Sequence, residues 1–170
     1  MLDSKTIHQL FYKLNSALEQ EGEKGEVIIV GGAVMCLVFN ARNSTRDVDA
    51  VFKPAQTIRK HVQKIGEEMG IALDWLNDAA KGFLMPNFER QTILELSHLC
   101  VWAPEPKYML AMKCISARWD TSDKDDVYFL IRFLNLKTAE DVFKIIEGYY
   151  PKKKVPPKTQ FFIEELFENK

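Results

Sequence analysis

A pair of glycines after a short apolar run restricts this chain more than any other feature. Val27–Val30 is typical of a buried strand, and Gly31-Gly32 lets the backbone turn sharply at its end. A helix that begins at Ala33 would direct its unpaired N–H groups toward an incoming anion. The pattern therefore predicts a strand, a phosphate-binding turn and a helix in succession.

Two aspartates follow this unit. Asp47 and Asp49 stand two residues apart in Arg46–Phe52, which has the character of a strand. Side chains at i and i+2 of a strand point to the same face, roughly 6–7 Å apart along it. Two carboxylates so placed repel each other unless a cation lies between them, and oxygen ligands of this kind suit Mg²⁺. A phosphate-binding turn beside such a pair indicates metal-assisted phosphoryl or nucleotidyl transfer. The other interpretation, the polar face of an edge strand, leaves two neighbouring like charges without a partner.

Composition bounds the class of protein. The 170 residues suit one domain, or a compact domain with a small helical appendage. With 46% apolar and 28% charged residues the chain can bury a core. A net charge of −1 gives no global positive field, so contact with nucleic acid requires a local patch such as Lys152–Lys154.

Cysteine usage and the absence of long apolar runs predict the compartment. Cys36, Cys100 and Cys114 are widely spaced in apolar contexts, which favours buried free thiols over a structural zinc site. No apolar run approaches the ~18 residues of a membrane span, and the N-terminus lacks a signal-peptide pattern. We therefore expect a cytoplasmic protein without membrane association.

The order of the expected elements changes along the chain. The first part mixes helices and strands, and the part after Pro104 and Pro106 is helical throughout, which predicts an α+β fold with a small mixed sheet. The expected division is 1–104 as the core and 105–170 as a helical C-terminal region packed on it. The first expected helix is capped by Asp3 or Ser4 and ends in the stretch 21–25. The other expected helices are 33–39, 54–69, 107–117, 122–134, 138–147 and 159–167, and the expected strands are 27–30, 46–52, 92–96 and 99–102. The stretch 71–86 shows no clear pattern.

Gly31-Gly32, a helix, and then Thr45-x-Asp47-Val48-Asp49 resemble the nucleotidyltransferase superfamily with the polymerase-beta-like fold. Within it, the pattern looks like the branch of AbiEii-type abortive-infection and toxin nucleotidyltransferases. The resemblance implies transfer of a nucleoside monophosphate from an NTP to an acceptor hydroxyl. Gly31 and Gly32 would cradle the triphosphate, Asp47 and Asp49 would hold Mg²⁺ (or Mn²⁺), and Thr45 would contact a phosphate or hold the aspartates in place.

A second match lies in the helical part. The stretch from Met109 to Arg118, followed by Asp123 to Val127, is similar to the Lys…Arg…Asp-x-x-Asp helices that follow the sheet in that branch. The resemblance implies that Lys113 stabilises charge on the phosphates. Asp126 or Asp123 would orient Lys113 or assist proton transfer. A lysine that only flanks the apolar face of its helix, and acids that only favour the first turn of theirs, are the structural alternatives.

The superfamily usually adds a third carboxylate on another strand, and the candidates here are Glu95 and Asp74. Three functions stay open at this point. The first is an active nucleotidyltransferase, which could be the toxin of a toxin–antitoxin or phage-defence pair. The second is a catalytically inactive nucleotide-binding or protein-interaction module of the same fold. The third is an interaction protein whose acids bind no metal. The expected partners are an NTP, an RNA, protein or small-molecule acceptor, and an antitoxin.

Overall fold

A computed structural model describes residues 1–170 except 117–121, 152–154 and 169–170. By its own contacts the chain divides into two units. The first, the sheet unit, contains Met1–Gly82 and Arg90–Ala103, and the second, the helical unit, contains Phe83–Glu89 and Pro104–Lys170. The expected division had placed residues 83–89 in the first part.

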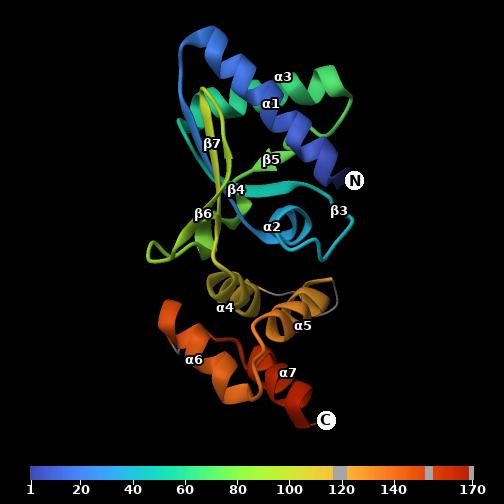
Figure 1. Ribbon diagram of the computed structural model, residues 1–170, viewed down its shortest axis with the longest axis vertical. Coiled ribbons are helices and arrows are strands. Elements are labelled where there is room, and N and C mark those ends of the chain that lie inside the picture. Colours follow the sequence, from blue (N-terminus) through green and yellow to red (C-terminus); the bar gives the residue numbers. More distant parts are fainter. Residues whose placement is uncertain (117–121, 152–154, 169–170) are drawn as a thin grey trace. The chain divides into compact units, whose positions relative to one another are not determined.

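A five-stranded mixed sheet forms the centre of the sheet unit (Figure 1). Its strands are β2 (Gly25–Ile29), β4 (Val48–Lys53), β5 (Leu76–Asn77), β6 (Arg90–Glu95) and β7 (Leu99–Pro104). Their order in the sheet is β5-β4-β2-β7-β6. β2 pairs antiparallel with β4 and parallel with β7, and β4 pairs parallel with β5. Two further short strands, β1 (Leu2–Asp3) and β3 (Ser44–Thr45), pair antiparallel in a small separate sheet.

Two amphipathic helices of the sheet unit, α1 (Ser4–Glu21) and α3 (Ala55–Met69), pack against each other. The Asp3 carboxylate caps α1 by accepting from the Thr6 N–H at 2.7 Å, and a glycine in the left-handed region ends each helix. The apolar stripe that the spacing predicts for α1 is fully buried, so that prediction is confirmed: Ile7, Leu10, Phe11, Leu14 and Leu18.

The third helix of the sheet unit, α2 (Gly31–Leu37), lies against β3 and β4. It begins and ends two residues earlier than expected. The Val38 and Phe39 N–H groups both donate to the Val34 carbonyl, and Asn40 takes a φ of 51°, so the chain leaves the helix there.

The helical unit contains α4 (Pro106–Ser116), α5 (Asp123–Phe133), α6 (Ala139–Tyr149) and α7 (Pro157–Glu168). α4 is its central helix, because it contacts both α5 and α6 and is buried continuously from Tyr108 to Cys114. The segment 83–89 joins this unit through hydrogen bonds to tyrosines. The Met85 N–H donates to the Tyr108 hydroxyl at 2.6 Å, and the Tyr150 hydroxyl donates to the Phe83 carbonyl at 2.6 Å.

The predicted α+β class, with a mixed sheet first and helices afterwards, is confirmed. The prediction missed the two-residue strands β1, β3 and β5, because so short a run shows no periodicity. It also began one strand too early, at Arg46 instead of Val48. Within the described residues, none of the helices is long and apolar enough to cross a membrane.

Candidate active site

The turn after β2 holds the Asp49 carboxylate against Gly31. Gly31 has a φ of 63°, a left-handed conformation that favours glycine. A Cβ added to it would lie 3.1 Å from Asp49 Oδ2. The antiparallel pairing of β2 with β4 causes this approach, and the Val30 N–H donates to the Asp49 carbonyl at 2.8 Å. The structure thus brings together the glycine turn and one of the two aspartates.

Gly32 is packed against Thr45 and Arg42. A Cβ on Gly32 would lie 2.6 Å from Thr45 Oγ1 and 3.3 Å from Arg42 Nη1. Thr45 is buried, and its hydroxyl donates to the Asp47 carbonyl at 3.1 Å. Sequence reasoning missed Arg42, because an arginine in a loop carries no spacing that marks it. Its guanidinium is always charged and suited to binding phosphate in a bidentate manner.

Asp47 lies in a bend that precedes β4, and the expectation that it shares a strand face with Asp49 is wrong. The pairing of β3 with β1 diverts the chain at Thr45, and the hydrogen bond from Thr45 to the Asp47 carbonyl holds the bend. Both aspartates are half-buried, and Asp49 lies on the less buried face of β4. The Thr45 bend therefore determines how Asp47 is presented.

A polar side chain that the sequence did not assign lies on the strand next to Asp49. Asn77 of β5 is the register partner of Asp49 in the parallel β4–β5 pair. The Val48 N–H donates to the Trp75 carbonyl at 2.7 Å and extends this pairing. The Asn77 Oδ1 accepts from the Ala79 N–H at 2.9 Å, so its carboxamide is oriented. An amide oxygen at this position is a further hard ligand atom beside the aspartates.

The second predicted group of site residues lies in the helical unit. The Lys113 ammonium of α4 is 2.6 Å from Asp123 Oδ1 and 2.8 Å from Asp126 Oδ2 of α5. Lys113 is 6% exposed and Asp126 is 2% exposed, so both charges are removed from water. Two carboxylates on one buried ammonium hold it in a defined position, and loss of the ammonium would leave both carboxylates without a countercharge in this cluster. The structure brings together the lysine and the two aspartates that the sequence proposed as its partners.

Comparison with protein families decides the class of protein that carries this geometry. Residues 5–148 match the family described as a nucleotidyltransferase of unknown function (DUF6036). The chain belongs to this nucleotidyltransferase family. Comparison with curated proteins and with solved structures gives no match. The superfamily predicted from the sequence is therefore confirmed at the level of this family, and the AbiEii branch stays a prediction.

Neither candidate for a third carboxylate in this member of the family lies beside Asp49. Glu95 is exposed on β6, and β2 and β7 separate that strand from β4. Asp74 is exposed in the segment before β5. Among the residues that the structure describes, no group of three or more His, Cys, Asp or Glu side chains is placed to hold a metal ion.

The oxygen atoms around this turn nevertheless fit a hard cation. Asp47 and Asp49 offer carboxylate oxygens, and Asn77 and Thr45 offer neutral oxygens close to them in the fold. Mg²⁺ is usually bound by one or two carboxylates together with waters and substrate phosphates, so a third acid is not required for binding. The oxygen donors at this turn therefore suit Mg²⁺ or Mn²⁺ bound together with a nucleotide.

The remaining sequence predictions concern thiols and basic residues. All three cysteines are free; Cys36 and Cys114 are buried as expected, whereas Cys100 is half-buried. Burial raises the pKa of the Cys36 and Cys114 thiols, so both stay protonated and unreactive at neutral pH. Arg118 and Lys152–Lys154 lie outside the described residues.

Proposed function

We propose that this member of the family is a metal-dependent nucleotidyltransferase that transfers a nucleoside monophosphate from an NTP to an acceptor hydroxyl. The single observation that carries the proposal is the packing of Asp49 on Gly31, 3.1 Å from the position of a Cβ there. An acid held against this turn keeps a metal ligand beside the backbone that would contact a phosphate.

The chain's own residues would act on the triphosphate as follows. Gly31 and Gly32 would admit the phosphates to the backbone, and the Arg42 guanidinium would bind phosphate oxygens beside Gly32. Asp47 and Asp49 would hold Mg²⁺, which when bound offsets phosphate charge and lowers the pKa of the acceptor hydroxyl. The acceptor oxygen forms a bond to the α-phosphorus, the bond from that phosphorus to the β-phosphate oxygen breaks, pyrophosphate leaves, and the hydroxyl proton passes to solvent.

The family resemblance gives Lys113, with Asp126 and Asp123 beside it, the role of stabilising charge on the phosphates. Because two carboxylates hold the Lys113 ammonium at 2.6 and 2.8 Å, it would stay fixed in one rotamer. A fixed ammonium is worth more to a developing phosphate charge than a mobile one, since no reorganisation is needed during the reaction. Asp126 and Asp123 would act as positioning residues for Lys113.

The direct test uses NTPs labelled either at the α- or at the γ-phosphate, with Mg²⁺ or Mn²⁺ and total RNA or protein as acceptor. Transfer of the α-label and not of the γ-label identifies nucleotidyl transfer. We expect the Asp47→Ala/Asp49→Ala variant to lose transfer. Equal transfer by this variant, or none by the wild type with any of the four NTPs, would overturn the proposal.

A matched control separates loss of the site from loss of charge. Glu26 and Glu67 are exposed acids of the same unit, on β2 and α3. The Glu26→Ala/Glu67→Ala variant removes the same two charges and should keep full transfer. Thermal unfolding of both variants shows whether each remains folded.

A second candidate function is a nucleotide-binding module without turnover. The observation that favours it is that the register partner of Asp49 on β5 is Asn77, a neutral residue, whereas both candidate third acids are exposed elsewhere. This function predicts that NTP with Mg²⁺ raises the melting temperature and that no product forms. Measurable product would exclude it.

The resemblance to the AbiEii branch adds the prediction that the activity is toxic and that an antitoxin protein opposes it. Induced expression of the wild-type chain should then arrest growth of the host cell, and the Asp47→Ala/Asp49→Ala variant should not. Unimpaired growth with confirmed nucleotidyl transfer would remove the toxin role and keep the enzyme.

A further inference from the structure

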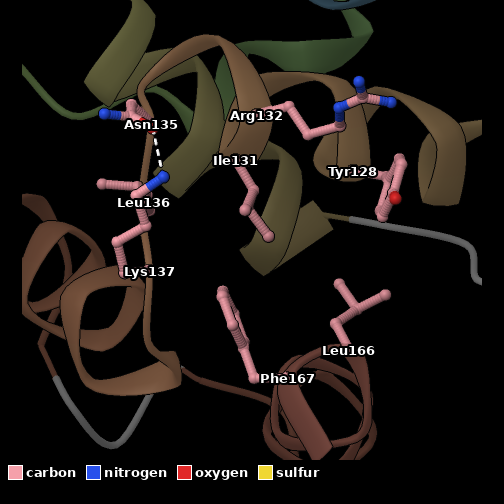
Figure 2. A pocket seen from close by; sticks show the side chains of 8 residues that line it. All are labelled: Tyr128, Ile131, Arg132, Asn135, Leu136, Lys137, Leu166 and Phe167. Carbon is pink, nitrogen blue, oxygen red and sulfur yellow. Dashed lines mark hydrogen bonds between the residues drawn. The ribbon is translucent and has the colours of Figure 1, made fainter. Parts of the chain in front are cut away.

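A cavity of about 210 Å³ lies within the helical unit, between α5, the turn that follows it and α7 (Figure 2). Ile131 and Leu136 line it from one side, and Leu166 and Phe167 of α7 line it from the other. Ile131 is buried, whereas the other three are half-buried. The cavity therefore has apolar walls that are in part open to solvent.

Backbone hydrogen bonds fix the shape of the turn. Asn135 adopts a φ of 55°, and its N–H donates to the Arg132 carbonyl at 3.0 Å. The Leu136 N–H donates to the Ile131 carbonyl, also at 3.0 Å. This pair of bonds is the Schellman closure of a helix, in which asparagine can replace the usual glycine. It places Leu136 and Lys137 at the cavity without a mobile loop.

Two cations line the same cavity. The Arg132 guanidinium lies 5.8 Å from the ring centre of Tyr128, and the Lys137 ammonium donates to Asn135 Oδ1 (Figure 2). Within the described part of the chain, no carboxylate lines the cavity and none pairs with either cation. An anion bound there would meet these two positive charges, and the Asp141 carboxylate, which accepts from the Lys137 N–H at 3.2 Å, lies at the backbone of the second.

The apolar walls and the aromatic ring narrow the class of ligand. A bare anion, or the carboxylate of an acidic peptide, would satisfy the cations but would leave the Tyr128 ring, which is 44% exposed, in contact with water. A nucleotide combines a flat ring that can stack on Tyr128 with a phosphate for Arg132 and Lys137. The volume is below the 300–1,000 Å³ or so that is usual for a whole drug-sized ligand, so one base and its phosphate suit it best.

We propose that this cavity is a second nucleotide site, which binds one nucleotide of a single-stranded RNA through Tyr128, Arg132 and Lys137. It deepens the proposed function, because a strand held by the helical unit would be the acceptor of nucleotidyl transfer. The binding itself does not depend on Asp47 and Asp49, and the two proposals can fail separately.

The test measures binding of a fluorescein-labelled RNA oligonucleotide by fluorescence anisotropy in the Asp47→Ala/Asp49→Ala background, which removes the proposed metal site. We expect Arg132→Gln/Lys137→Gln to weaken binding at least about tenfold and to reduce the slope of log K against log salt by about 0.7, for one phosphate neutralised on a single strand. Lys107→Gln/Lys144→Gln, with the same charge change at exposed positions of α4 and α6, should bind as the parent does.

The aromatic part of the site has its own pair of variants. Tyr128→Ala should weaken binding by about tenfold because the stacked base loses its platform, and Tyr128→Phe should restore it. If AMP displaces the labelled RNA, the site exists and can also bind a free nucleotide. If only unlabelled oligonucleotide displaces it, the site exists and requires a nucleic-acid strand. Three outcomes would overturn the proposal. The first is no binding of the oligonucleotide at low salt, and the second is an equal loss of binding in Arg132→Gln/Lys137→Gln and Lys107→Gln/Lys144→Gln. The third is displacement of the RNA by a polyglutamate peptide as effectively as by unlabelled RNA.

Discussion

The sharpest prediction concerns the contact between Gly32 and Thr45. A Cβ on Gly32 would lie 2.6 Å from Thr45 Oγ1, closer than such atoms approach in proteins, and Thr45 is buried and cannot move aside freely. Gly32→Ala must therefore displace the hydroxyl and break its 3.1 Å hydrogen bond to the Asp47 carbonyl. The substitution acts on the bend that presents Asp47, and not only on the helix that contains it.

The expected loss of unfolding free energy in Gly32→Ala is the sum of three contributions. Overpacking of a filled site costs about 1–3 kcal/mol, and the lost hydrogen bond adds about 1 kcal/mol. The higher helix propensity of alanine returns less than about 1 kcal/mol near the start of a helix. We therefore expect Gly32→Ala to lower the free energy of unfolding by about 2 kcal/mol, and Thr45→Ala alone to lower it by about 1 kcal/mol.

The double variant decides the cause. In Gly32→Ala/Thr45→Ala the new methyl group occupies the space that the hydroxyl has left, so the loss should be about 1 kcal/mol or less, well below the combined losses of the single variants. Urea unfolding followed by circular dichroism gives each free energy. Gly82→Ala, with no atom within 4 Å of the added Cβ, is the control and should be nearly neutral. Additive losses, within about 0.5 kcal/mol, would refute the contact as the cause.

Three further predictions follow from the same structure. Asn77→Asp adds a carboxylate at the register position beside Asp49, so it should tighten Mn²⁺ binding in calorimetry. Lys113→Met leaves carboxylates facing a site without a cation, so it should lower the free energy of unfolding at neutral pH by about 3–5 kcal/mol in a urea titration. Hydrogen bonding holds the pKa of Asp141 below its usual 3.8. The largest contribution comes from the Thr138 side chain, and neighbouring backbone N–H groups add to it. The stabilisation is therefore present above pH 3.8 and disappears as the pH falls through the lower, folded-state pKa, and Asp141→Asn should flatten the dependence of unfolding free energy on pH in that acidic window.

Each of these predictions has an outcome that contradicts it. Unchanged metal affinity in Asn77→Asp would mean that this side chain does not face the aspartates. A loss below about 1 kcal/mol in Lys113→Met would mean that the charges are better solvated than their burial indicates. If the unfolding free energy of Asp141→Asn depends on acidic pH as that of the wild type does, the capping carboxylate is not the cause of that dependence. Glu140→Gln, at an exposed neighbouring position, is the control.

The features that the sequence predicts correctly are those with a local cause. The stripe on α1 repeats with the period of a helix, and Lys113 and Asp126 lie on two consecutive helices that pack together. The glycine turn follows from an apolar strand and two residues without side chains. In each case the residues that interact either are neighbours in the chain or follow a regular repeat.

The features that the sequence does not predict depend on long-range pairing. Asn77 is beside Asp49 only because β5, a strand of two residues, adds to the edge of β4. Asp47 leaves the strand because β3 pairs with β1, which directly precedes α1 and is far from β3 in the sequence. Arg42 faces Gly32 through a loop between these elements. No local periodicity encodes such contacts, since the sheet order decides them.

The packing of the two glycines bears on what their substitution can show. Asp49 and Thr45 already occupy the space that side chains at positions 31 and 32 would need, so the fold requires glycine there whether or not a phosphate binds. Loss of activity in Gly32→Ala alone is therefore ambiguous. The Gly32→Ala/Thr45→Ala variant removes the clash and keeps the added methyl group beside Arg42. It therefore separates the effect of the methyl group on ligand binding from its effect on packing. If the triphosphate lies against Gly32, this variant will be folded and still bind NTP more weakly than Thr45→Ala. Equal affinity would confine Gly32 to a packing role.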